Sequence, residues 1–523
     1  MATPDTENPT QTPSLKPPLQ STAAPRDNEP YAEDVQKVLK WQEGRIARRL
    51  KGEYESAVMH LTEVINSNLH TPISVSSVRV EGAPNTRQSF IGSLIRPILS
   101  ECTSGPQDLE SVLHTTRKMS RRLHETDLFK SVEVRIEEAR DVMADAGAVD
   151  LVFKTREKGR FYLNTSTELG NEEGNASATA RVRNAFGGAE TFEANLSMGT
   201  KTRRSFRASL EAPLSSDLAT RGELSAYGME RDNTAFASSF ETLRGLKASV
   251  RTGSSNRGLG MHEITYEAVI RHIGAFAPVA SISMRRCAGQ TTKSAISHTW
   301  TMDSRDDRIT ATRGHYAKFY QELAGLGGDA AFYKVESEAQ ISRSVWPGLS
   351  FSWGSRAGLL WSLRDKPSLF SDRFQLGGPT SVRMFRHNGL GPRDGSDSLG
   401  GDIFWSTGLS ILSSIPQKPH WPIKIHGFVN AGRLDNVDQS RPLTSTIRDT
   451  LTRPSVSVGL GLVYRFDPVR VEVNFGVPLV ASKSDASRKG LQLTCSTSVM
   501  RCSRPFARTP CFVRFLQSYK AQP

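Results

Sequence analysis

Two adjoining segments decide the fold: Ser455–Phe466, which reads SVSVGLGLVYRF, and residues 469–479, which read VRVEVNFGVPL. In the first segment the even positions are all apolar or aromatic, and the odd positions are mostly serine and glycine. In the second segment the apolar residues fall on the odd positions, with arginine, glutamate and asparagine between them. Because successive side chains of a β-strand point to opposite faces, both segments are predicted to be strands with one apolar face and one polar or small face.

The same period of two runs through the chain from residue 161 onward. So many strands in one continuous run exceed the usual open sheet and need closure. The pattern therefore predicts a transmembrane antiparallel β-barrel that is apolar outside and polar within. A soluble β-sandwich, whose strands alternate in the same way, is the alternative. We count about sixteen strands, one of them irregular, which begin near residues 161, 175, 190, 205, 221, 240, 259, 281–303, 314, 330, 349, 401, 423, 455, 469 and 490.

The composition argues against several other classes of protein. The 523 residues have a mean hydropathy of −0.40 and contain no uninterrupted apolar stretch of about 18 residues, so no transmembrane helix is predicted. The net charge of +13 is spread along the chain without a basic stripe, so no nucleic-acid partner is predicted. Five cysteines do not make a disulfide scaffold. The N-terminus lacks the basic and apolar regions of a secretory signal.

Ahead of the predicted barrel the chain changes character three times. Residues 1–30 hold seven of the 27 prolines and are predicted to be a disordered tail. Residues 31–71 are predicted to be helical, with a basic cluster that either forms a solvated face or contacts an anionic membrane surface. Residues 72–158 have the order strand, helix, helix, strand, strand, which predicts a compact α+β unit whose sheet edge can accept an extended peptide. The basic cluster consists of Arg45, Arg48, Arg49 and Lys51.

The connection between the strands near residues 349 and 401 does not alternate. Its core, residues 364–400, is long for a turn, and structureless connections of such length are usually functional or disordered. Apolar residues that need burial are mixed in it with glycines that permit sharp reversals. We predict that this loop folds into the lumen of the barrel, with a loop packed on the rim as the alternative. The glycines expected to act as its hinges are Gly377, Gly378, Gly389 and Gly391.

With these residues in view, the chain resembles the bacterial surface antigen superfamily of outer-membrane assembly barrels. Within it, the chain is similar to the barrel subunits of the mitochondrial sorting and assembly machinery (SAM, also called TOB), in fungal form. The segments that carry the resemblance are residues 147–212, 373–402, 401–416, 423–432 and 459–479.

The resemblance implies one POTRA-like domain at residues 72–158, a barrel of about sixteen strands at 159–500 and an atypical tail at 501–523. It implies a multi-pass protein of the mitochondrial outer membrane that inserts and folds β-barrel precursors, with the POTRA-like domain facing the intermembrane space. The implied partners are those precursors, peripheral SAM subunits including a metaxin-like one, and membrane lipid. The resemblance implies no cofactor, no metal and no covalent catalysis.

The predicted lumen loop carries the most specific motif of this family. Where the family has Val or Ile, then Arg, Gly and an aromatic residue, this chain has Val382, Arg383, Met384 and Phe385, so that methionine replaces the glycine. The family implies that this arginine bonds to polar groups on the barrel wall, and the matching wall position here is Asn430. A buried guanidinium needs such a partner because an unpaired charge is costly to bury.

The resemblance also implies a lateral seam between the first and last strands of the barrel. The last strand is short of apolar residues and departs from the family pattern, with Thr494 in place of a glycine and Thr497 in place of a hydrophobic residue. We therefore expect the seam to be the weakest pairing in the barrel, and residues 493–523 to be an altered end from a gene-model or exon change. The seam residues are expected to be Phe161, Leu163, Thr165, Leu169, Gly490, Leu491 and Leu493.

Other functions find less support in the sequence. The chain has no phosphate-binding loop of the G-x-x-x-x-G-K-[ST] type, no H-E-x-x-H and no C-x-x-C, so no enzyme is predicted. A passive solute or polypeptide-conducting outer-membrane channel is the main alternative to an assembly factor, because it would use the same fold. A soluble binding module is the third possibility, and alkaline extraction of membranes separates it from both.

Overall fold

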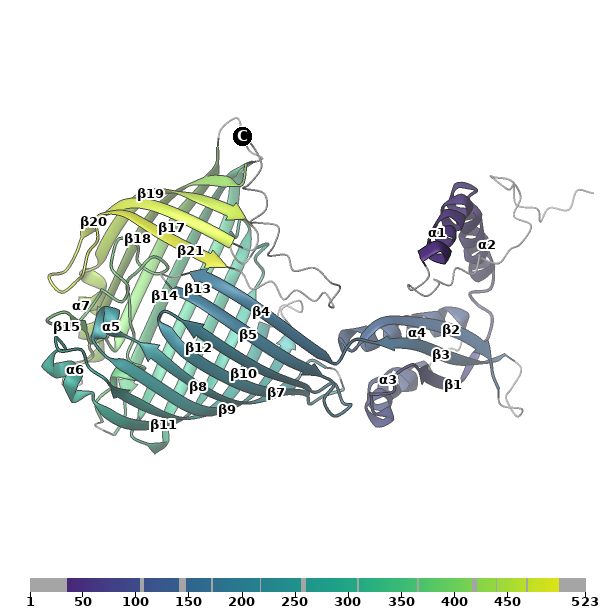
Figure 1. Cartoon of the computed structure of the whole chain (residues 1–523), viewed down its shortest axis with the longest axis horizontal. Helices are drawn as coiled ribbons and strands as arrows, with labels where there is room; N and C mark the ends of the chain where they lie inside the picture. The colour runs from purple at the N-terminus through teal and green to yellow at the C-terminus, as the bar shows by residue number, and fades with distance from the viewer. Residues whose placement is uncertain are drawn as a thin grey trace, which may run out of the picture. The chain divides into compact units, whose positions relative to one another are not determined.

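The computed structural model (Figure 1) describes residues 35–103, 108–140, 147–170, 173–216, 218–254, 260–307, 310–364, 366–415, 421–438, 440–466 and 469–497. The predicted tails at residues 1–30 and 501–523 lie outside these ranges. The chain divides into two compact units, which are described separately below: Met1–Ala83 with Gly92–Arg156, and Pro84–Ile91 with Glu157–Pro523. Among the described residues, no helix combines the length and the apolar character that crossing a membrane requires.

The first unit begins with two helices, α1 (Val35–Leu50) and α2 (Glu53–Ser67), where the sequence predicted one helical segment. The break falls at Gly52, whose φ of 70° lies in the left-handed region that glycine adopts without strain. After them comes the predicted α+β unit, in the predicted order of elements. It contains β1 (Ser74–Glu81), α3 (Gln88–Thr103), α4 (Leu109–Glu125), β2 (Phe129–Glu138) and β3 (Ala148–Glu157).

The sheet of this α+β unit has the strand order β1-β3-β2, with β1 parallel to β3. Its core is formed by one apolar face of α4 against the central strand, because Val112 and Leu123 of α4 and Phe153 of β3 are completely buried. Asp150 of β3 is also buried, and it accepts hydrogen bonds from Ser77 Oγ at 2.7 Å and Arg79 Nη2 at 3.1 Å. The hydrogen bond from Ser77, supported by nearby arginines, holds the pKa of this carboxyl below its ordinary value although burial opposes the shift.

The second unit is an antiparallel sheet of sixteen strands in the described part of the chain, and sequence neighbours pair throughout (Figure 1). This confirms the predicted fold class and the approximate strand count. The irregular segment at 281–303 resolves into α6 (Ile282–Arg286) and one regular strand. The strands are β4 (Phe161–Gly170), β5 (Glu173–Arg183), β6 (Thr191–Gly199), β7 (Thr202–Pro213), β8 (Arg221–Asp232), β9 (Phe240–Ser254), β10 (Gly260–Gly274), β11 (Gly289–Asp303), β12 (Gly314–Gly328), β13 (Phe332–Trp346), β14 (Leu349–Ser362), β17 (Ile403–Ser414), β18 (Ile423–Asp435), β19 (Ser455–Phe466), β20 (Val469–Val480) and β21 (Gly490–Thr497).

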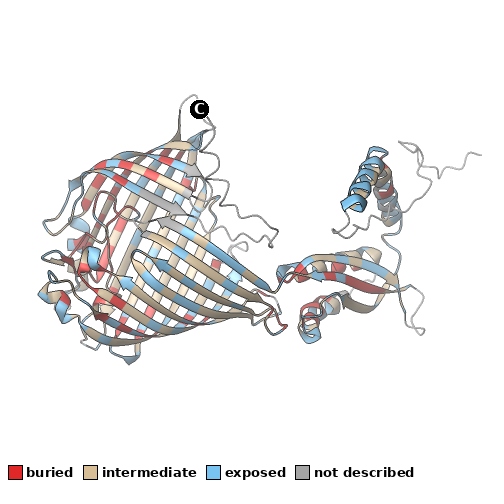
Figure 2. Cartoon of the chain, in the orientation of Figure 1, coloured by how far each residue is buried: buried red, intermediate tan, exposed pale blue. Residues whose placement is uncertain are grey.

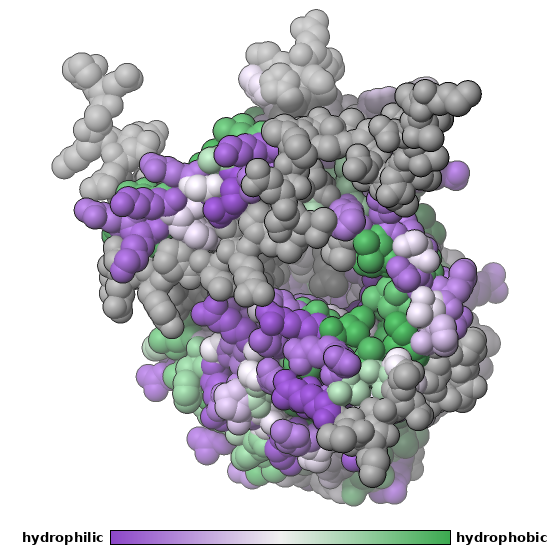
Figure 3. All heavy atoms as spheres, turned by 90° about the vertical axis from the view of Figure 1, so that its right-hand side faces the viewer, coloured by the Kyte–Doolittle hydropathy of each residue, from purple (hydrophilic) through white to green (hydrophobic). Residues whose placement is uncertain are grey.

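The two faces of this sheet are inverted relative to a soluble protein (Figure 2). Outward residues such as Leu460 and Phe475 are 68% and 65% exposed, whereas inward residues such as His426, Asn474 and Gln492 are buried. The space-filling view in Figure 3 shows hydrophobic residues at the surface beside hydrophilic ones. An apolar surface of this extent is stable only when something apolar covers it, and an apolar-out, polar-in barrel is the arrangement that lipid requires.

The sheet is not closed among the described residues. Its two end strands, β4 and β21, approach each other, but no hydrogen-bonded ladder joins them. Among the described residues, the two facing edges therefore lack the ladder of backbone hydrogen bonds that would close a barrel.

Candidate functional site: the lumen loop and the open seam

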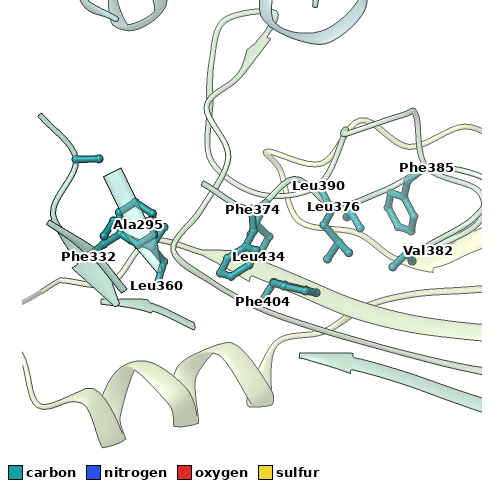
Figure 4. Packing of buried hydrophobic residues seen from close by; sticks show 12 residues of the cluster. Ala295, Phe332, Leu360, Phe374, Leu376, Val382, Phe385, Leu390, Phe404 and Leu434 are labelled. Atoms are coloured by element: carbon teal, nitrogen blue, oxygen red, sulfur yellow. The ribbon is translucent and has the colours of Figure 1, made fainter. Parts of the chain in front are cut away.

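The loop between β14 and β17 packs against the inward face of the sheet. Five of its apolar side chains pack against inward-facing residues of the wall in one buried cluster (Figure 4). The loop also reaches beyond the strand ends, because Arg383 contacts Glu472 and Met384 lies beside Gly476, both within β20. The cluster consists of Phe374, Leu376, Val382, Phe385 and Leu390 from the loop, with Ala295, Ala324, Ala330, Phe332, Leu360, Phe404 and Leu434 from the wall.

Three of the four predicted hinge glycines have backbone conformations that favour glycine. The φ angles of Gly377, Gly378 and Gly391 are 107°, 119° and 101°. Gly389 is required for space instead, because a Cβ there would lie 2.9 Å from the carbonyl oxygen of Arg386 and 3.2 Å from Cβ of Ala486. These glycines allow the loop to double back on itself within the lumen.

Met384 keeps the backbone turn of the glycine that the family motif has at this position. Its φ is 66°, in the left-handed region that costs a residue with a Cβ about 1–2 kcal/mol. The Met384 side chain is completely buried, and its Cγ lies 3.1 Å from where a Cβ on Gly476 of β20 would stand. The methionine thus fills the space above a glycine of the wall, and this packing opposes the strain of its backbone.

The partner of Arg383 is Glu472 of β20, and the prediction of Asn430 was wrong. Arg383 Nη2 donates to Glu472 Oε2 at 3.2 Å, and the Arg383 guanidinium lies 5.2 Å from the ring centre of Phe428. Asn430 of β18 does face the loop, but its Nδ2 donates to the backbone carbonyl of Ser381 at 3.1 Å. A charged arginine is better matched by a carboxylate than by an amide, because both the charge and the hydrogen bond are then satisfied.

Glu472 holds more than the loop arginine. Arg470, two residues away on the same inward face of β20, donates to Glu472 Oε1 at 2.5 Å, and Asn474 Nδ2 donates to Glu472 Oε2 at 3.1 Å. One buried carboxylate therefore serves two guanidinium groups and one amide. Beside this cluster is a cavity of about 300 Å³ that Arg383, Arg470 and Asn430 help to line.

Further polar contacts fasten the loop to the opposite side of the wall. Asp372 in the 3-10 turn η2 (Phe370–Asp372) forms a buried ion pair with Arg271 of β10 at 2.8 Å. Lys334 of β13 donates to the carbonyl oxygen of Asp372 at 3.0 Å. Asp397, in the short strand β16 (Asp397–Ser398), accepts a hydrogen bond from Ser238 Oγ at 2.6 Å. The loop thus bridges distant parts of the wall.

The most extensive polar contacts of the loop are with the connection before the last strand, residues 481–489. Two backbone hydrogen bonds join this connection to the loop from Arg386 N to Ala486 O at 2.9 Å and from Ala486 N to Gly389 O at 2.8 Å. A third runs from Arg488 N to Met384 O at 2.9 Å. The loop therefore pairs with this connection almost as a neighbouring strand would.

Gln492 extends this attachment into the last strand itself. Its side chain is buried on the lumen side of β21, where its Oε1 accepts from Met384 N at 3.2 Å and its Nε2 donates to Phe385 O at 3.5 Å. Both polar atoms of the Gln492 amide are thus hydrogen-bonded to the loop backbone at Met384 and Phe385. The sequence analysis did not identify Gln492, Glu472 or residues 481–489. The alternating strand pattern does, however, place Gln492 and Glu472 on the inward face of the sheet.

The predicted seam residues all lie on the two end strands. In β4, Phe161 is 80% exposed, Leu163 and Thr165 are exposed, and Leu169 pairs with Gly174 of β5. In β21, Gly490 begins the strand with a φ of 100°, and Leu491 and Leu493 are exposed. Among the described residues the two strands come near each other without pairing, and the side chains of Phe161, Leu163, Leu491 and Leu493 are exposed.

Comparisons with known proteins agree with this geometry. A family model described as the Omp85 superfamily domain matches residues 184–499. A SAM50-like protein of Schizosaccharomyces pombe is 34% identical over 455 residues, which cover 85% of this chain and 95% of that protein. The Homo sapiens sorting and assembly machinery component 50 homolog is 30% identical over 427 residues, covering 80% and 89%. The crystal structure of BamA from Haemophilus ducreyi lacking POTRA domains 1–3 aligns with a TM-score of 0.68 at 16% identity, covering 82% and 85%.

An apolar-out sheet of sixteen strands with a loop packed in its lumen defines a β-barrel of the outer-membrane type. The chain belongs to the Omp85 superfamily, and within it to the family of SAM sorting and assembly machinery proteins. It is accordingly a β-barrel protein of the mitochondrial outer membrane, in a family of β-barrel assembly proteins. In the described part of the chain, no group of three or more His, Cys, Asp or Glu side chains is placed to hold a metal ion.

Proposed function

We propose that this chain inserts and folds β-barrel precursors in the mitochondrial outer membrane, and that the precursor enters at the seam between β4 and β21. The single observation that supports the proposal is that, in the described part of the chain, no ladder of hydrogen bonds joins these two end strands of an otherwise continuous sheet. In lipid each unpaired N–H or C=O group costs several kcal/mol, so an open edge attracts a partner strand. The terminal strand of a precursor supplies those hydrogen bonds by strand addition.

The two edges of this seam have different roles in the proposed cycle, because the lumen loop is attached to the β21 side. Gln492 and residues 481–489 tie β21 to the loop, and the loop is tied to the wall through Arg383 and Glu472. Such contacts hold the β21 edge in a fixed position while precursor strands are added beside it. Growth then continues at the seam until the precursor closes on itself. No covalent bond is made or broken in this cycle, so the chain acts without catalytic residues.

The proposal includes the setting of the protein. The POTRA-like domain faces the intermembrane space, from which precursors arrive, and its sheet edge offers them a first site for strand addition. The peripheral SAM subunits, one of them metaxin-like, are the partners of the barrel. Sequence similarity to sorting and assembly machinery proteins supports this setting.

Reconstitution tests the proposed function. The purified full-length chain is placed in lipid vesicles, and a porin precursor is added with and without it. We expect the chain to increase the fraction of precursor that becomes protease-resistant and membrane-integrated. A precursor that integrates equally well in vesicles without the chain would contradict the proposal.

The same vesicles distinguish the proposed assembly function from that of a passive channel. Because the loop packs its apolar residues across the lumen, we expect single-channel conductance to be low and unrelated to precursor integration. A large steady conductance in a chain that does not integrate precursor would favour the passive solute or polypeptide-conducting channel.

A further inference from the structure

Helix α1 carries an apolar stripe that nothing in the described structure covers. At about 100° per residue, Val35, Leu39, Ile46 and Leu50 fall within about 60° of the helix circumference. All four side chains are exposed, by 52–80%, and α1 has no buried residue. The side of α1 that is partly covered, at Val38 and Trp41, lies on a different part of the circumference.

Basic residues occupy much of the helix surface outside this stripe. Residues 35–51 contain six basic side chains and a single acidic one, Glu43, which is next to the stripe. Lys40, Arg49 and Lys51 have no ion-pair partner among the described residues. Arg49 flanks the stripe on one side, and Lys40 and Lys51 lie beyond it on the other. The six basic residues are Lys37, Lys40, Arg45, Arg48, Arg49 and Lys51.

We propose that α1 docks on the surface of an anionic phospholipid bilayer, with Val35, Leu39, Ile46 and Leu50 among the acyl chains and its basic residues near the phosphates. A helix with an apolar stripe and a basic polar face lies in the plane of such an interface. Each basic residue near an anionic surface adds to the attraction. The helix is also covalently linked to a barrel that is in a membrane.

The charge of α1 argues against the other occupants of this stripe. A second copy of the chain would bring a helix of the same net positive charge beside this one, which repels rather than attracts. Docking would fix the N-terminal helices at the membrane surface and so restrict where the POTRA-like domain receives its ligands.

The test uses the full-length chain with its five cysteines replaced by serine, in lipid vesicles. One variant carries Ile46→Cys on the stripe, and a matched control carries Ala47→Cys, which is the next residue, exposed and off the stripe. Each cysteine is labelled with a fluorophore whose emission is quenched by a quencher attached to the acyl chains. One vesicle set is phosphatidylcholine alone, and the other contains about a third phosphatidylinositol, which is anionic.

We expect quenching at residue 46 but not at residue 47, and more of it in the anionic vesicles. Reversing three charges, with Lys40→Glu, Arg49→Glu and Lys51→Glu together, should weaken docking at least about a hundredfold, because each basic residue near the surface contributes about 1 kcal/mol. Protease resistance of the barrel in the same vesicles verifies that each variant is folded.

Three results would overturn the proposal. The first is the absence of quenching at residue 46 in anionic vesicles. The second is equal quenching in both vesicle sets with no effect of the charge reversal, because anionic lipid would then play no part. The third is quenching at residue 46 that is absent at high chain density and appears only when the chain is diluted in lipid, which would show that a second copy covers the stripe.

Discussion

The two edges of the sixteen-stranded sheet are held in place by different means. On the β21 side, Gln492 and the connection before the strand are hydrogen-bonded to the lumen loop. On the β4 side, a side-chain hydrogen bond among the described residues joins the strand to its own hairpin partner, between Ser166 Oγ and Ser177 Oγ at 2.8 Å. The comparison teaches that an end strand of a barrel can be held from inside the lumen as well as through its own hairpin.

The largest effect is expected when the carboxylate at the centre of the β21 side is removed. Glu472→Ala leaves the Arg383 and Arg470 guanidinium groups buried without their shared anion, which should cost about 3–5 kcal/mol of stability. Thermal unfolding of the purified barrel, followed by its shift in gel mobility, measures this loss.

Glu336→Ala is the matched control for Glu472→Ala. Glu336 is also an inward-facing glutamate paired with a cation, Lys334, but its side chain is 34% exposed compared with 7% for Glu472. Its loss should cost less than about 1 kcal/mol. Equal effects of the two substitutions would mean that the cluster at Glu472 has no special part in holding the loop.

A smaller effect is expected from Arg383→Ala. Glu472 then keeps Arg470 and Asn474 as partners, so the loss of stability should be about 1–3 kcal/mol. The loop would lose its charged attachment to β20, and assembly of a porin precursor should slow accordingly. Arg383→Lys should restore only part of this function because a lysine is a point charge without the planar fork. Normal precursor assembly in Arg383→Ala would remove the role assigned to this arginine.

Gln492→Leu should reduce stability less than Arg383→Ala does. Its main effect should be a local loosening of the strands at the seam. The substitution leaves the N–H of Met384 and the carbonyl of Phe385 without their partner, at about 1–2 kcal/mol. Amide hydrogen exchange should accelerate in β20 and β21 and stay unchanged in β13, which serves as the internal reference. Unchanged exchange in β21 would show that the loop does not hold this edge.

The smallest effect is expected at the other edge. Ser166→Ala removes one hydroxyl pair between β4 and β5, worth about 0.5–1 kcal/mol. Exchange should then increase only in the β4–β5 hairpin. A change in exchange that spread to β21 would contradict the separation of the two edges.

The strand pattern made most of this architecture predictable. The alternation in 455–466 and 469–479 identified which side chains point outward, and the structure confirms that choice for Leu460 and Phe475. Strand starts were predictable because a lipid-facing strand must be apolar on one side for its whole length. Only the segment at 281–303 looked irregular, because α6 precedes the strand there.

The partners inside the lumen were harder to predict. Asn430 was chosen for Arg383 by its place in a family motif, whereas the actual pairing depends on which inward residue lies nearest across the lumen, and that is Glu472. Arg470, Glu472 and Asn474 all fall on the inward-facing positions of their strand, so each could have been considered as a partner of Arg383. The spacing of residues along one strand, however, does not give their distances to a loop inside the barrel. Residues 481–489 carry no apolar or periodic signal, so nothing in the sequence indicated their backbone pairing with the loop.

The most direct test of the account is whether a precursor in transit touches the seam. A photoreactive amino acid is placed at Leu163 in β4 and, in a separate variant, at Leu246 in β9. These two outward-facing leucines are 57% and 61% exposed. A crosslinker at either position should therefore contact lipid to a similar extent. The account predicts a crosslink to an arrested porin precursor from position 163 and none from position 246. Equal crosslinking from both positions, or none from position 163, would contradict it.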